Sequence, residues 1–285
     1  MGITIKQPFV SPLRYPGGKR KLFYLFGQLI ESNGLTGCSY AEPYAGGAGL
    51  ALKLLFKGLV SHIYINDIDS SIFAFWYSVL NHTNELSSLI RSTRVNMKNW
   101  RLQRAVQRNR DKVTKLELGF STFYLNRTNR SGILNGGVIG GKDQSGKYKL
   151  NVRYNKKDLV NRINQVAERK DQITISNGEG RDFIDLILKR RHTKLLLYLD
   201  PPYFVKGNEL YENHFTYRDH KELSEKIRQI TGNWIVSYDN VPEIKNLYNW
   251  CKSVEYSINY TAREKVAGNE IMFFSPSLSV AGLQA

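Results

Sequence analysis

The residues best suited to chemistry follow an apolar run near position 200. The segment "KLLLYLDPPYF", residues 194–204, is typical of a buried strand that ends in Asp200, Pro201, Pro202 and Tyr203. The Asp200 carboxylate and the Pro201 carbonyl can both accept hydrogen bonds. The two prolines fix the turn and have no N–H that would occupy those acceptors. Tyr203 adds a flat face on which a base can stack, a contact worth about 1–3 kcal/mol.

Two acceptors beside an aromatic ring are suited to holding the exocyclic amine of a nucleobase. The lone pair of that nitrogen is delocalised into the ring, so the amine is a poor nucleophile. Acceptors for its hydrogens favour a pyramidal nitrogen whose lone pair points at an electrophile, and positioning supplies the rest. The alternative is a simple strand-ending turn, because Asp and Pro are common turn residues. The complete D-P-P-Y sequence after an apolar strand is rarer than such a turn.

A glycine-rich turn lies in "AEPYAGGAGLAL", residues 41–52, between an expected strand and an expected helix. Glycines there let the backbone approach a ligand and direct helix N–H groups at it. Asp67 in "INDID" lies 21 residues after Gly46, at the end of the next expected strand. Dinucleotide folds place an acid for a ribose hydroxyl at this point. The pattern predicts an adenosine-type cofactor, with tight packing of the turn as the alternative. NAD is less suited, because its enzymes have G-x-G-x-x-G.

The charge of the chain is concentrated in one segment. The 285 residues include 41 Lys and Arg against 25 Asp and Glu, a formal net charge of +16. Residues 91–170 hold 20 of these basic residues and only five of the acidic ones. A basic excess confined to one segment is expected of a surface that binds a polyanion. Nucleic acid is therefore favoured over a helical face that is merely solvated.

The order of the expected elements is that of an α/β fold. Strand, glycine-rich turn, helix and strand follow one another in residues 38–67, which indicates a parallel βαβ unit. Basic helices and a glycine-rich polar stretch follow. The α/β rhythm then returns and ends with "NEIMFFS" as an antiparallel strand. We predict a discontinuous α/β domain from residues 1–83 and 171–285, with a basic insertion at residues 84–170.

Other classes of protein and site are not indicated. The sequence has no run of 18 apolar residues and no charged-then-apolar leader, so we expect neither a membrane span nor a signal peptide. Cys38 and Cys251 make neither a disulfide framework nor a zinc site. Four of the five histidines have no ligand spacing, and His220 is expected at the start of a capped helix. We expect a cytoplasmic protein, bacterial nucleoid-associated or phage-encoded, that needs no metal.

The ordered segments "YPGGK", "EPYAGGAG", "INDID", "GRDF" and "DPPY" resemble those of the Dam-type (D12 class) DNA adenine-N6 methyltransferases, and the resemblance covers nearly the whole chain. It implies a class I S-adenosylmethionine-dependent (Rossmann-like) sheet with an inserted helical target-recognition domain. It also implies methyl transfer from S-adenosylmethionine to N6 of a flipped-out adenine in double-stranded DNA. D-P-P-Y alone also occurs in relatives that methylate cytosine N4 or RNA adenine. The leading "YPGGK" and the long insertion narrow the resemblance to the adenine enzymes.

The resemblance further implies roles for individual residues. The D-P-P-Y residues would hold the target base, with Asp200 also near the methionine end of the cofactor. The cofactor-binding residues would be Tyr15, Lys19, Glu42, Tyr44, Gly46, Asp67, Asp182, Phe183 and Asp200. The candidates for DNA contact in the insertion are Asn126, Arg127, Asn129, Arg130, Lys142 and Arg153.

The chain also departs from the family pattern. Ala48 stands where many relatives have glycine, and Tyr15 replaces the commoner tryptophan. The Arg-Tyr-Asn…Phe-Asn-x-Pro-x-Gly hairpin of GATC-reading members is missing from residues 123–159. We therefore expect a recognition site other than GATC. Methylation of cytosine N4 or RNA adenine, a catalytically silent DNA-binding regulator and an NAD-dependent oxidoreductase remain alternatives. A cognate restriction endonuclease could be a partner, and the sequence does not indicate an oligomeric state.

Overall fold

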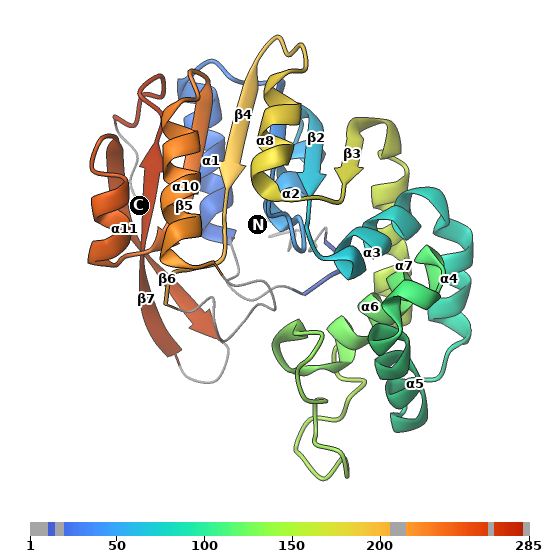
Figure 1. The fold of residues 1–285 in the computed structure, drawn as a ribbon. Helices are drawn as coiled ribbons and strands as arrows, with labels where there is room; N and C mark the ends of the chain where they lie inside the picture. The colour runs from blue at the N-terminus through green and yellow to red at the C-terminus, as the bar shows by residue number, and fades with distance from the viewer. Residues whose placement is uncertain (1–10, 15–19, 206–214, 262–264, 282–285) are drawn as a thin grey trace, which may run out of the picture. The chain divides into compact units, whose positions relative to one another are not determined.

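The computed structural model describes residues 11–14, 20–205, 215–261 and 265–281 (Figure 1). The chain forms two compact units. The sheet unit comprises Tyr15–Phe73 and Asp171–Ala285, and the helical unit comprises Met1–Arg14 and Ala74–Lys170. The second segment of the helical unit begins at Ala74, within helix α3 (Ser70–Asn81), and the insertion at residues 84–170 stays a prediction.

The sheet unit contains a seven-stranded sheet in the order β3-β2-β1-β4-β5-β7-β6. Its strands are β1 (Cys38–Glu42), β2 (Val60–Asn66), β3 (Ile173–Ser176), β4 (Leu195–Leu199), β5 (Asn233–Asp239), β6 (Lys252–Thr261) and β7 (Lys265–Phe274). Strands β1 to β5 pair in parallel, and β7 runs antiparallel to both β5 and β6. The carboxyl ends of the five parallel strands therefore meet at one edge, where α/β folds bind ligands.

The predicted mixed sheet with an antiparallel strand at "NEIMFFS" is confirmed, and β6 is an addition to it. "KSVEYSINYT" alternates apolar and polar residues, with Val254, Tyr256, Ile258 and Tyr260 at every second position. This alternation is typical of a strand with one buried face.

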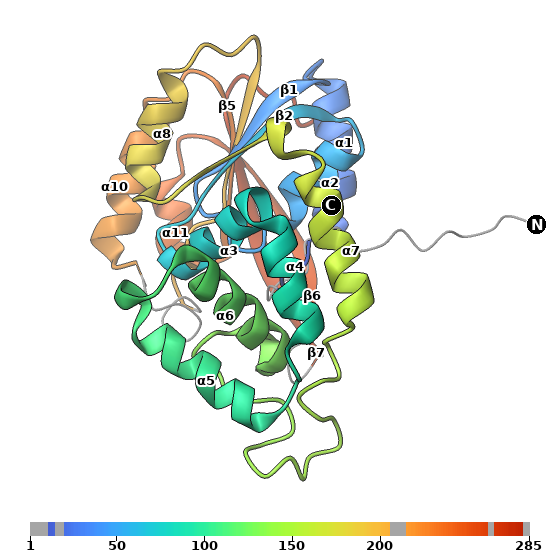
Figure 2. The same cartoon turned by 90° about the vertical axis from the view of Figure 1, so that its right-hand side faces the viewer.

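Helices cover both faces of the sheet (Figures 1 and 2). Helices α8 (Gly180–Leu188), α10 (Tyr217–Arg228) and α11 (Pro242–Leu247) lie on one face, and α1 (Arg20–Ser32) and α2 (Gly49–Phe56) lie on the other. Phe183 of α8, Leu223 of α10 and Ile244 of α11 pack with Trp234 and Val236 of β5 in one apolar cluster. Each such fully buried aliphatic or aromatic side chain contributes about 1.5–3 kcal/mol. The cluster thus holds the strands whose ends carry the predicted site.

The helical unit is built around one buried helix. The central helix is α6 (Lys115–Thr128), and the unit also contains most of α3 together with α4 (Thr83–Ser92), α5 (Met97–Arg108) and α7 (Lys156–Ala167). Thr114 and Glu117 form a capping box that begins α6, and every residue of α6 from Leu118 onward is buried. Gly119 permits close packing, because a Cβ there would lie 2.5 Å from the carbonyl oxygen of Ala74. Within the described residues, no helix is long and apolar enough to cross a membrane.

Candidate active site at the carboxyl edge of the sheet

The D-P-P-Y segment begins where the central strand β4 ends, between β1 and β5. The hydroxyl Oγ of Ser237, on β5, donates a hydrogen bond to Oδ1 of Asp200 at 2.6 Å. The hydroxyl of Tyr198 lies 2.8 Å from the same Ser237 Oγ. A serine hydroxyl has one proton, so Tyr198 donates to Ser237 and Ser237 donates to Asp200. This buried chain fixes the rotation of the Asp200 carboxylate.

The other end of the segment is also held by β5. The Asp239 carboxylate accepts the backbone N–H of Phe204 at 2.9 Å on Oδ1 and that of Val205 at 2.8 Å on Oδ2. Asp239 is only 6% exposed. Charge-assisted hydrogen bonds of this kind are about twice as strong as neutral ones. Asp239 therefore fixes the backbone immediately after Tyr203.

Tyr203 is half-buried beside acidic groups. Burial raises the pKa of its phenol well above the ordinary value, and the Asp200 carboxylate and the Tyr256 hydroxyl add to the shift. The phenol is therefore neutral in the folded protein. Pro201 is buried and Pro202 half-buried, so the proline pair packs against the protein.

The glycine-rich turn joins β1 to α2. The N–H of Ala45 bonds to the carbonyl of Asn66 at 2.9 Å, which ties the turn to the end of β2. Ala48, noted above as a departure from glycine, has φ 45° and ψ 32°. This left-handed conformation favours glycine. Gly49, the exposed first residue of α2, has no atom within 4 Å of the position that a Cβ would occupy. The backbone at the start of α2 is therefore open to a ligand.

Asp67 links this turn to the adjacent loop. Its Oδ2 accepts the N–H of Gly46 at 2.9 Å, and its Oδ1 accepts the N–H of Asp69 at 2.9 Å. Burial raises the pKa of Asp67 to about 7, although the N–H groups of Asp69 and Gly46 act in the opposite direction. A carboxylate oxygen can accept more than one hydrogen bond, so Asp67 retains acceptor capacity for ribose hydroxyls.

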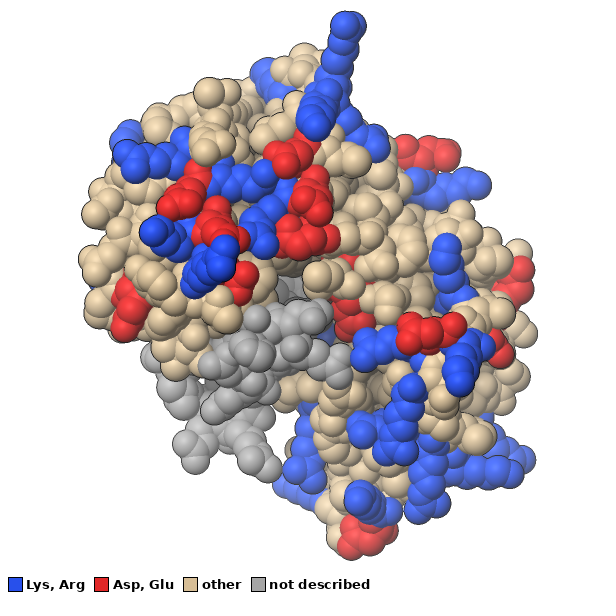
Figure 3. Space-filling model, in the orientation of Figure 1, with Lys and Arg blue, Asp and Glu red and all other residues tan. Residues whose placement is uncertain are grey.

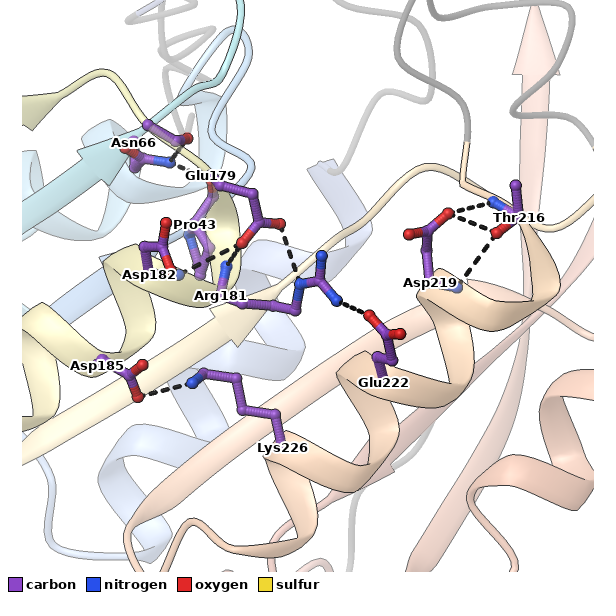
Figure 4. Close-up of polar contacts among 11 residues, drawn as sticks. Pro43, Asn66, Glu179, Arg181, Asp182, Asp185, Thr216, Asp219, Glu222 and Lys226 are labelled. Carbon is purple, nitrogen blue, oxygen red and sulfur yellow. Dashed lines mark hydrogen bonds and ion pairs between the residues drawn. The ribbon is translucent and has the colours of Figure 1, made fainter.

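Asn66 is a positioning residue that the sequence did not identify. Its Nδ2 donates to the carbonyl of Pro43 at 3.0 Å (Figure 4) and to that of Gly178 at 2.9 Å, and its Oδ1 accepts from Ser176 Oγ at 2.9 Å. Asn66 is 2% exposed. One amide thus ties together the loops after β1, β2 and β3. The signal was available, because a polar amide at the end of a buried strand needs internal partners.

Glu42 and Tyr44 lie on either side of Pro43. Glu42 is 5% exposed and accepts the Tyr40 hydroxyl on Oε1 at 2.9 Å. The hydroxyl oxygen of Tyr44 is buried and has no hydrogen-bond partner within the described residues. Gly180 makes room for the Tyr44 ring, because a Cβ there would lie 2.5 Å from ring atom Cε1. The glycine of "GRDF" therefore has a steric role beside the glycine-rich turn.

The start of α8 holds the remaining cofactor candidates (Figure 4). Glu179 caps the helix by accepting the N–H of Arg181 at 2.7 Å, and the Arg181 guanidinium also pairs with Glu222 of α10. Asp182 is exposed in the first turn, where a ligand can reach it. Phe183 is 5% exposed and belongs to the apolar cluster. Its ring packs inside the sheet unit, and the contact of Phe183 with the cofactor stays a prediction. Tyr15 and Lys19 lie outside the described residues.

Three of the candidates for DNA contact are used inside the helical unit. Asn126 bonds to the N–H and the carbonyl of Arg14, each at 2.7 Å. Arg127 donates from Nε to the carbonyl of Pro12 at 2.8 Å, and Asn129 accepts the indole N–H of Trp100 at 2.7 Å. Asn126, Arg127 and Asn129 are 2%, 8% and 0% exposed. Their polar atoms stabilise the fold, and their assignment to DNA contact stays a prediction.

Exposed cations remain on the helical unit. Arg130, Lys142 and Arg153 are exposed, and their contact with DNA stays a prediction. Lys98, Arg101 and Arg108 are also exposed, and their spacing places them on one side of α5. The lower right part of Figure 3, which shows the helical unit, carries mainly Lys and Arg with few acids. We name Lys98, Arg101 and Arg108 the α5 basic stripe. Sequence reasoning missed it because the exposed side of α5 was not known.

Comparison with protein families decides the identity of the chain. The sequence profile of the family described as "D12 class N6 adenine-specific DNA methyltransferase" matches residues 15–264. The chain belongs to this family. The methyltransferase therefore has the predicted class I fold, and S-adenosylmethionine is its cofactor. A comparison with curated proteins found no match.

Solved structures resemble the methyltransferase only distantly. A protein from Pyrococcus horikoshii that is assigned as an RNA methyltransferase is 11% identical, with 95% of this chain and 90% of that chain covered and a TM-score of 0.45. The rRNA methyltransferase AviRa from Streptomyces viridochromogenes is 12% identical, with 96% and 94% covered and a TM-score of 0.44. Likenesses at this level say nothing about the substrate of this methyltransferase.

The geometry of the carboxyl edge fits the cofactor of the family. The open backbone at Gly49 and the exposed Asp182 lie at the starts of α2 and α8, the helices that follow β1 and β3, and the acceptor Asp67 directly follows β2. Glycine at a close approach and a carboxylate for ribose hydroxyls are the groups that a nucleoside cofactor needs. In the part of the chain that the structure describes, no group of three or more His, Cys, Asp and Glu side chains could hold a metal ion.

Proposed function

We propose that the chain transfers the methyl group of S-adenosylmethionine to N6 of a flipped-out adenine at a specific site in double-stranded DNA. The main support for this proposal is the position of Asp200 at the end of the central strand, where the buried Ser237 orients its carboxylate. The D-P-P-Y segment lies within the residues matched by the adenine methyltransferase profile. The cofactor supplies an activated methyl group on a sulfonium.

The residues of the chain prepare the adenine amine for attack. Asp200 and the carbonyl of Pro201 accept the two amine hydrogens, which favours a pyramidal nitrogen with its lone pair directed at the methyl carbon. The amine forms a bond to that carbon as the carbon–sulfur bond breaks with its electron pair on sulfur, and it then releases one proton to Asp200 or solvent. Tyr203 stacks on the base as a neutral ring. Preorganised acceptors of this kind typically change rates by about 10²–10³.

Access to the amine requires the adenine to leave the duplex. An adenine in a base pair has its N6 hydrogen-bonded within the stack, and enzymes that modify such atoms extrude the nucleotide at a cost of a few kcal/mol. The edge of the sheet that carries Asp200 is where the extruded base would be held. Base flipping therefore belongs to the proposed mechanism.

The helical unit offers a surface for DNA. The α5 basic stripe can contact phosphates, which supply affinity but no sequence information. Arg130 lines an open hollow of about 440 Å³ together with Asp143, Lys147 and Tyr148. Arg can read guanine and Asp can read cytosine N4 through the major groove. We assign sequence reading to this hollow and expect a site other than GATC.

The decisive experiment is expression in a host that lacks adenine methylation, followed by single-base mapping of N6-methyladenine. Methylation of one short motif supports the proposal. If N6-methyladenine is absent from the DNA and N4-methylcytosine or methylated RNA adenine is found instead, that base is the substrate in place of DNA adenine. If purified protein binds S-adenosylmethionine and DNA but methylates nothing, the chain is a DNA-binding regulator. Cleavage of the same motif by an endonuclease encoded nearby would assign the enzyme to a restriction-modification system.

A further inference from the structure

Strand β5 holds both ends of the D-P-P-Y segment through two residues on one side of the strand. Ser237 and Asp239 are two positions apart, so their side chains leave the strand in the same direction. Ser237 bonds to Asp200, the first residue of the segment, at 2.6 Å. Asp239 bonds to the N–H groups of the two residues that follow Tyr203, at 2.9 and 2.8 Å.

Both residues are buried deeply enough for these bonds to matter. Ser237 is 0% and Asp239 6% exposed, so neither exchanges its partners for water at low cost. Asp239 also lies beside a packed aromatic group. The ring centroid of Phe204 lies 5.5 Å from that of His220, and His220 Nδ1 lies 3.0 Å from the Tyr238 hydroxyl. The backbone that Asp239 holds is therefore supported from its side-chain end as well.

We propose that Ser237 and Asp239 are positioning residues for methyl transfer. Ser237 sets the rotation of the Asp200 carboxylate toward the target amine, and Asp239 sets the path of the backbone that carries the Pro201 carbonyl and Tyr203. Neither touches the base. This proposal rests on the proposed function. It adds to that function the two residues that orient the hydrogen-bond acceptors for the target amine.

The physical reason for two residues is the geometry of the turn. A D-P-P-Y turn has no N–H at either proline, so its own backbone supplies few hydrogen bonds to stabilise it. Its two flanks must therefore be fixed from outside. Because β5 pairs with β4 in parallel register, with Leu199 beside Val236, its next residues reach the turn directly.

The test is single-turnover methylation of adenine DNA by Ser237→Ala, Ser237→Thr and Asp239→Asn. We expect Ser237→Ala and Asp239→Asn to lower the methyl-transfer rate constant by about 10- to 100-fold, the effect of a small misplacement of reacting groups. The dissociation constants for S-adenosylmethionine and for DNA should stay within about two-fold of wild type, because the acceptors are misaimed rather than removed. Ser237→Thr, which keeps the hydroxyl, should restore most of the rate.

The matched control is Ser275→Ala. Ser275 is also 0% exposed and accepts the N–H of Trp234 at 3.2 Å, at the opposite end of β5. Its replacement should lower the melting temperature about as much as Ser237→Ala and leave the rate constant unchanged. For Asp239→Asn the control is Glu117→Gln, which weakens the capping box of α6 in the helical unit.

The outcomes separate the two proposals. If Ser237→Ala and Asp239→Asn keep the wild-type rate constant, the positioning role is wrong. It is also wrong if their activity falls only as far as the amount of folded protein falls, as is expected for Ser275→Ala. In both cases the proposed function is unaffected. If wild-type protein methylates no adenine in any DNA, the proposed function fails first. Equal losses in Ser237→Thr and Ser237→Ala would also contradict the role of the serine hydroxyl.

Discussion

Asp67 accepts the backbone N–H of Gly46 at 2.9 Å, although the two residues are 21 positions apart in the chain. This bond joins the glycine-rich turn after β1 to the end of β2. It also places a half-buried carboxylate at the predicted ribose position, and burial raises the pKa of Asp67 to about 7. If Asp67 binds the ribose as proposed, we expect its protonation to be linked to cofactor binding near neutral pH.

The affinity for S-adenosylmethionine should increase as the pH rises through about 7. Ribose hydroxyls donate hydrogen bonds, so they favour the ionised form of Asp67 and lower its pKa in the complex. Calorimetric titration between pH 5.5 and 8.5 measures the effect, with proton release detected in buffers of different ionisation enthalpy. Asp67→Asn should bind more weakly and lose this pH dependence. A wild-type affinity that is constant across the range contradicts a ribose contact by Asp67.

In the protein without cofactor, the raised pKa of Asp67 makes the free energy of unfolding decrease as the pH rises, whereas the affinity for the cofactor increases. The folded protein binds the Asp67 proton more tightly than the unfolded chain does, so Asp67 contributes stability that is fully present below its ordinary pKa of 3.8. This contribution is lost as the pH rises through about 7. Asp67→Asn should therefore raise the melting temperature relative to wild type more at pH 8 than at pH 5. Thermal unfolding without cofactor at both pH values checks the sign.

Asp200→Ala should lower the methyl-transfer rate by about 10²–10³ or more, because it removes an acceptor for the target amine. DNA association should remain measurable, since phosphate contacts supply most of the affinity. The measurements are single-turnover methylation and fluorescence anisotropy on the same duplex. Asp185→Asn, which changes an exposed carboxylate of α8 that is paired with Lys226 of α10, is the control and should behave as wild type. A wild-type rate for Asp200→Ala would contradict the proposed role of Asp200 as an acceptor for the target amine.

The order of the motifs predicted the fold, because "EPYAGGAG", "INDID" and "DPPY" each lie where a strand meets a loop. Apolar runs followed by glycine or by D-P-P-Y identify the carboxyl ends of parallel strands, and these ends share one edge. Strand β6 could have been found from its alternation of apolar and polar residues. The buried roles of Asn126 and Phe183 could not, because a residue type in a helix does not say which side of the helix faces the core.

The partners of the D-P-P-Y segment could not be predicted for a related reason. Asp239 lies 39 positions beyond Asp200, and only the pairing of β5 with β4 brings the two together. A serine and an aspartate in "WIVSYDN" are typical of any strand end that runs into a loop. Which side of β5 faces the turn depends on strand register, and a shift of one residue would turn both side chains away.

Replacing the α5 basic stripe should weaken DNA binding without affecting cofactor binding. In Lys98→Ala/Arg101→Ala/Arg108→Ala the slope of log K against log salt should decrease by about 0.9 for each phosphate that the variant no longer neutralises. The control is Lys57→Ala/Lys189→Ala/Arg191→Ala. It removes the same amount of positive charge, but from three exposed side chains of the sheet unit. Filter binding at several salt concentrations gives both slopes. Equal decreases in the two triple variants would indicate a general charge effect and no DNA surface on α5.

Asn126→Ala should lower the free energy of unfolding, whereas Arg153→Ala should lower the affinity for DNA. Without the Asn126 amide the N–H and carbonyl of Arg14 lose partners at 2.7 Å, which costs about 1–3 kcal/mol for each buried group left unsatisfied. Denaturant unfolding measures this cost. Arg153 is exposed, so its loss should leave unfolding unchanged and weaken DNA binding. A change in DNA affinity without a change in stability in Asn126→Ala would place that residue on the DNA surface.

The recognition site should depend on Gln144, although we do not expect this side chain to touch DNA. Its Nε2 donates to the carbonyls of Ile139 at 2.8 Å and Gly141 at 2.7 Å, and its Oε1 accepts the N–H of Leu150 at 2.9 Å. These bonds fix the loop that carries Lys147 and Tyr148 into the hollow beside Arg130. Gln144→Ala should therefore relax the methylated motif, with several sequences modified where wild type modifies one.

Mapping of N6-methyladenine at single-base resolution in cells that express each variant measures this relaxation. The control is Gln107→Ala, the same substitution in the helical unit, where Gln107 bonds to Ser121 and Thr122 between α5 and α6. It should lower stability and keep the motif. If Gln144→Ala methylates the wild-type motif alone, at a reduced level, the loop contributes affinity only and the sequence is read elsewhere on the helical unit. Relaxation in Gln144→Ala alone would place the reading surface on the loop from Ile139 to Leu150.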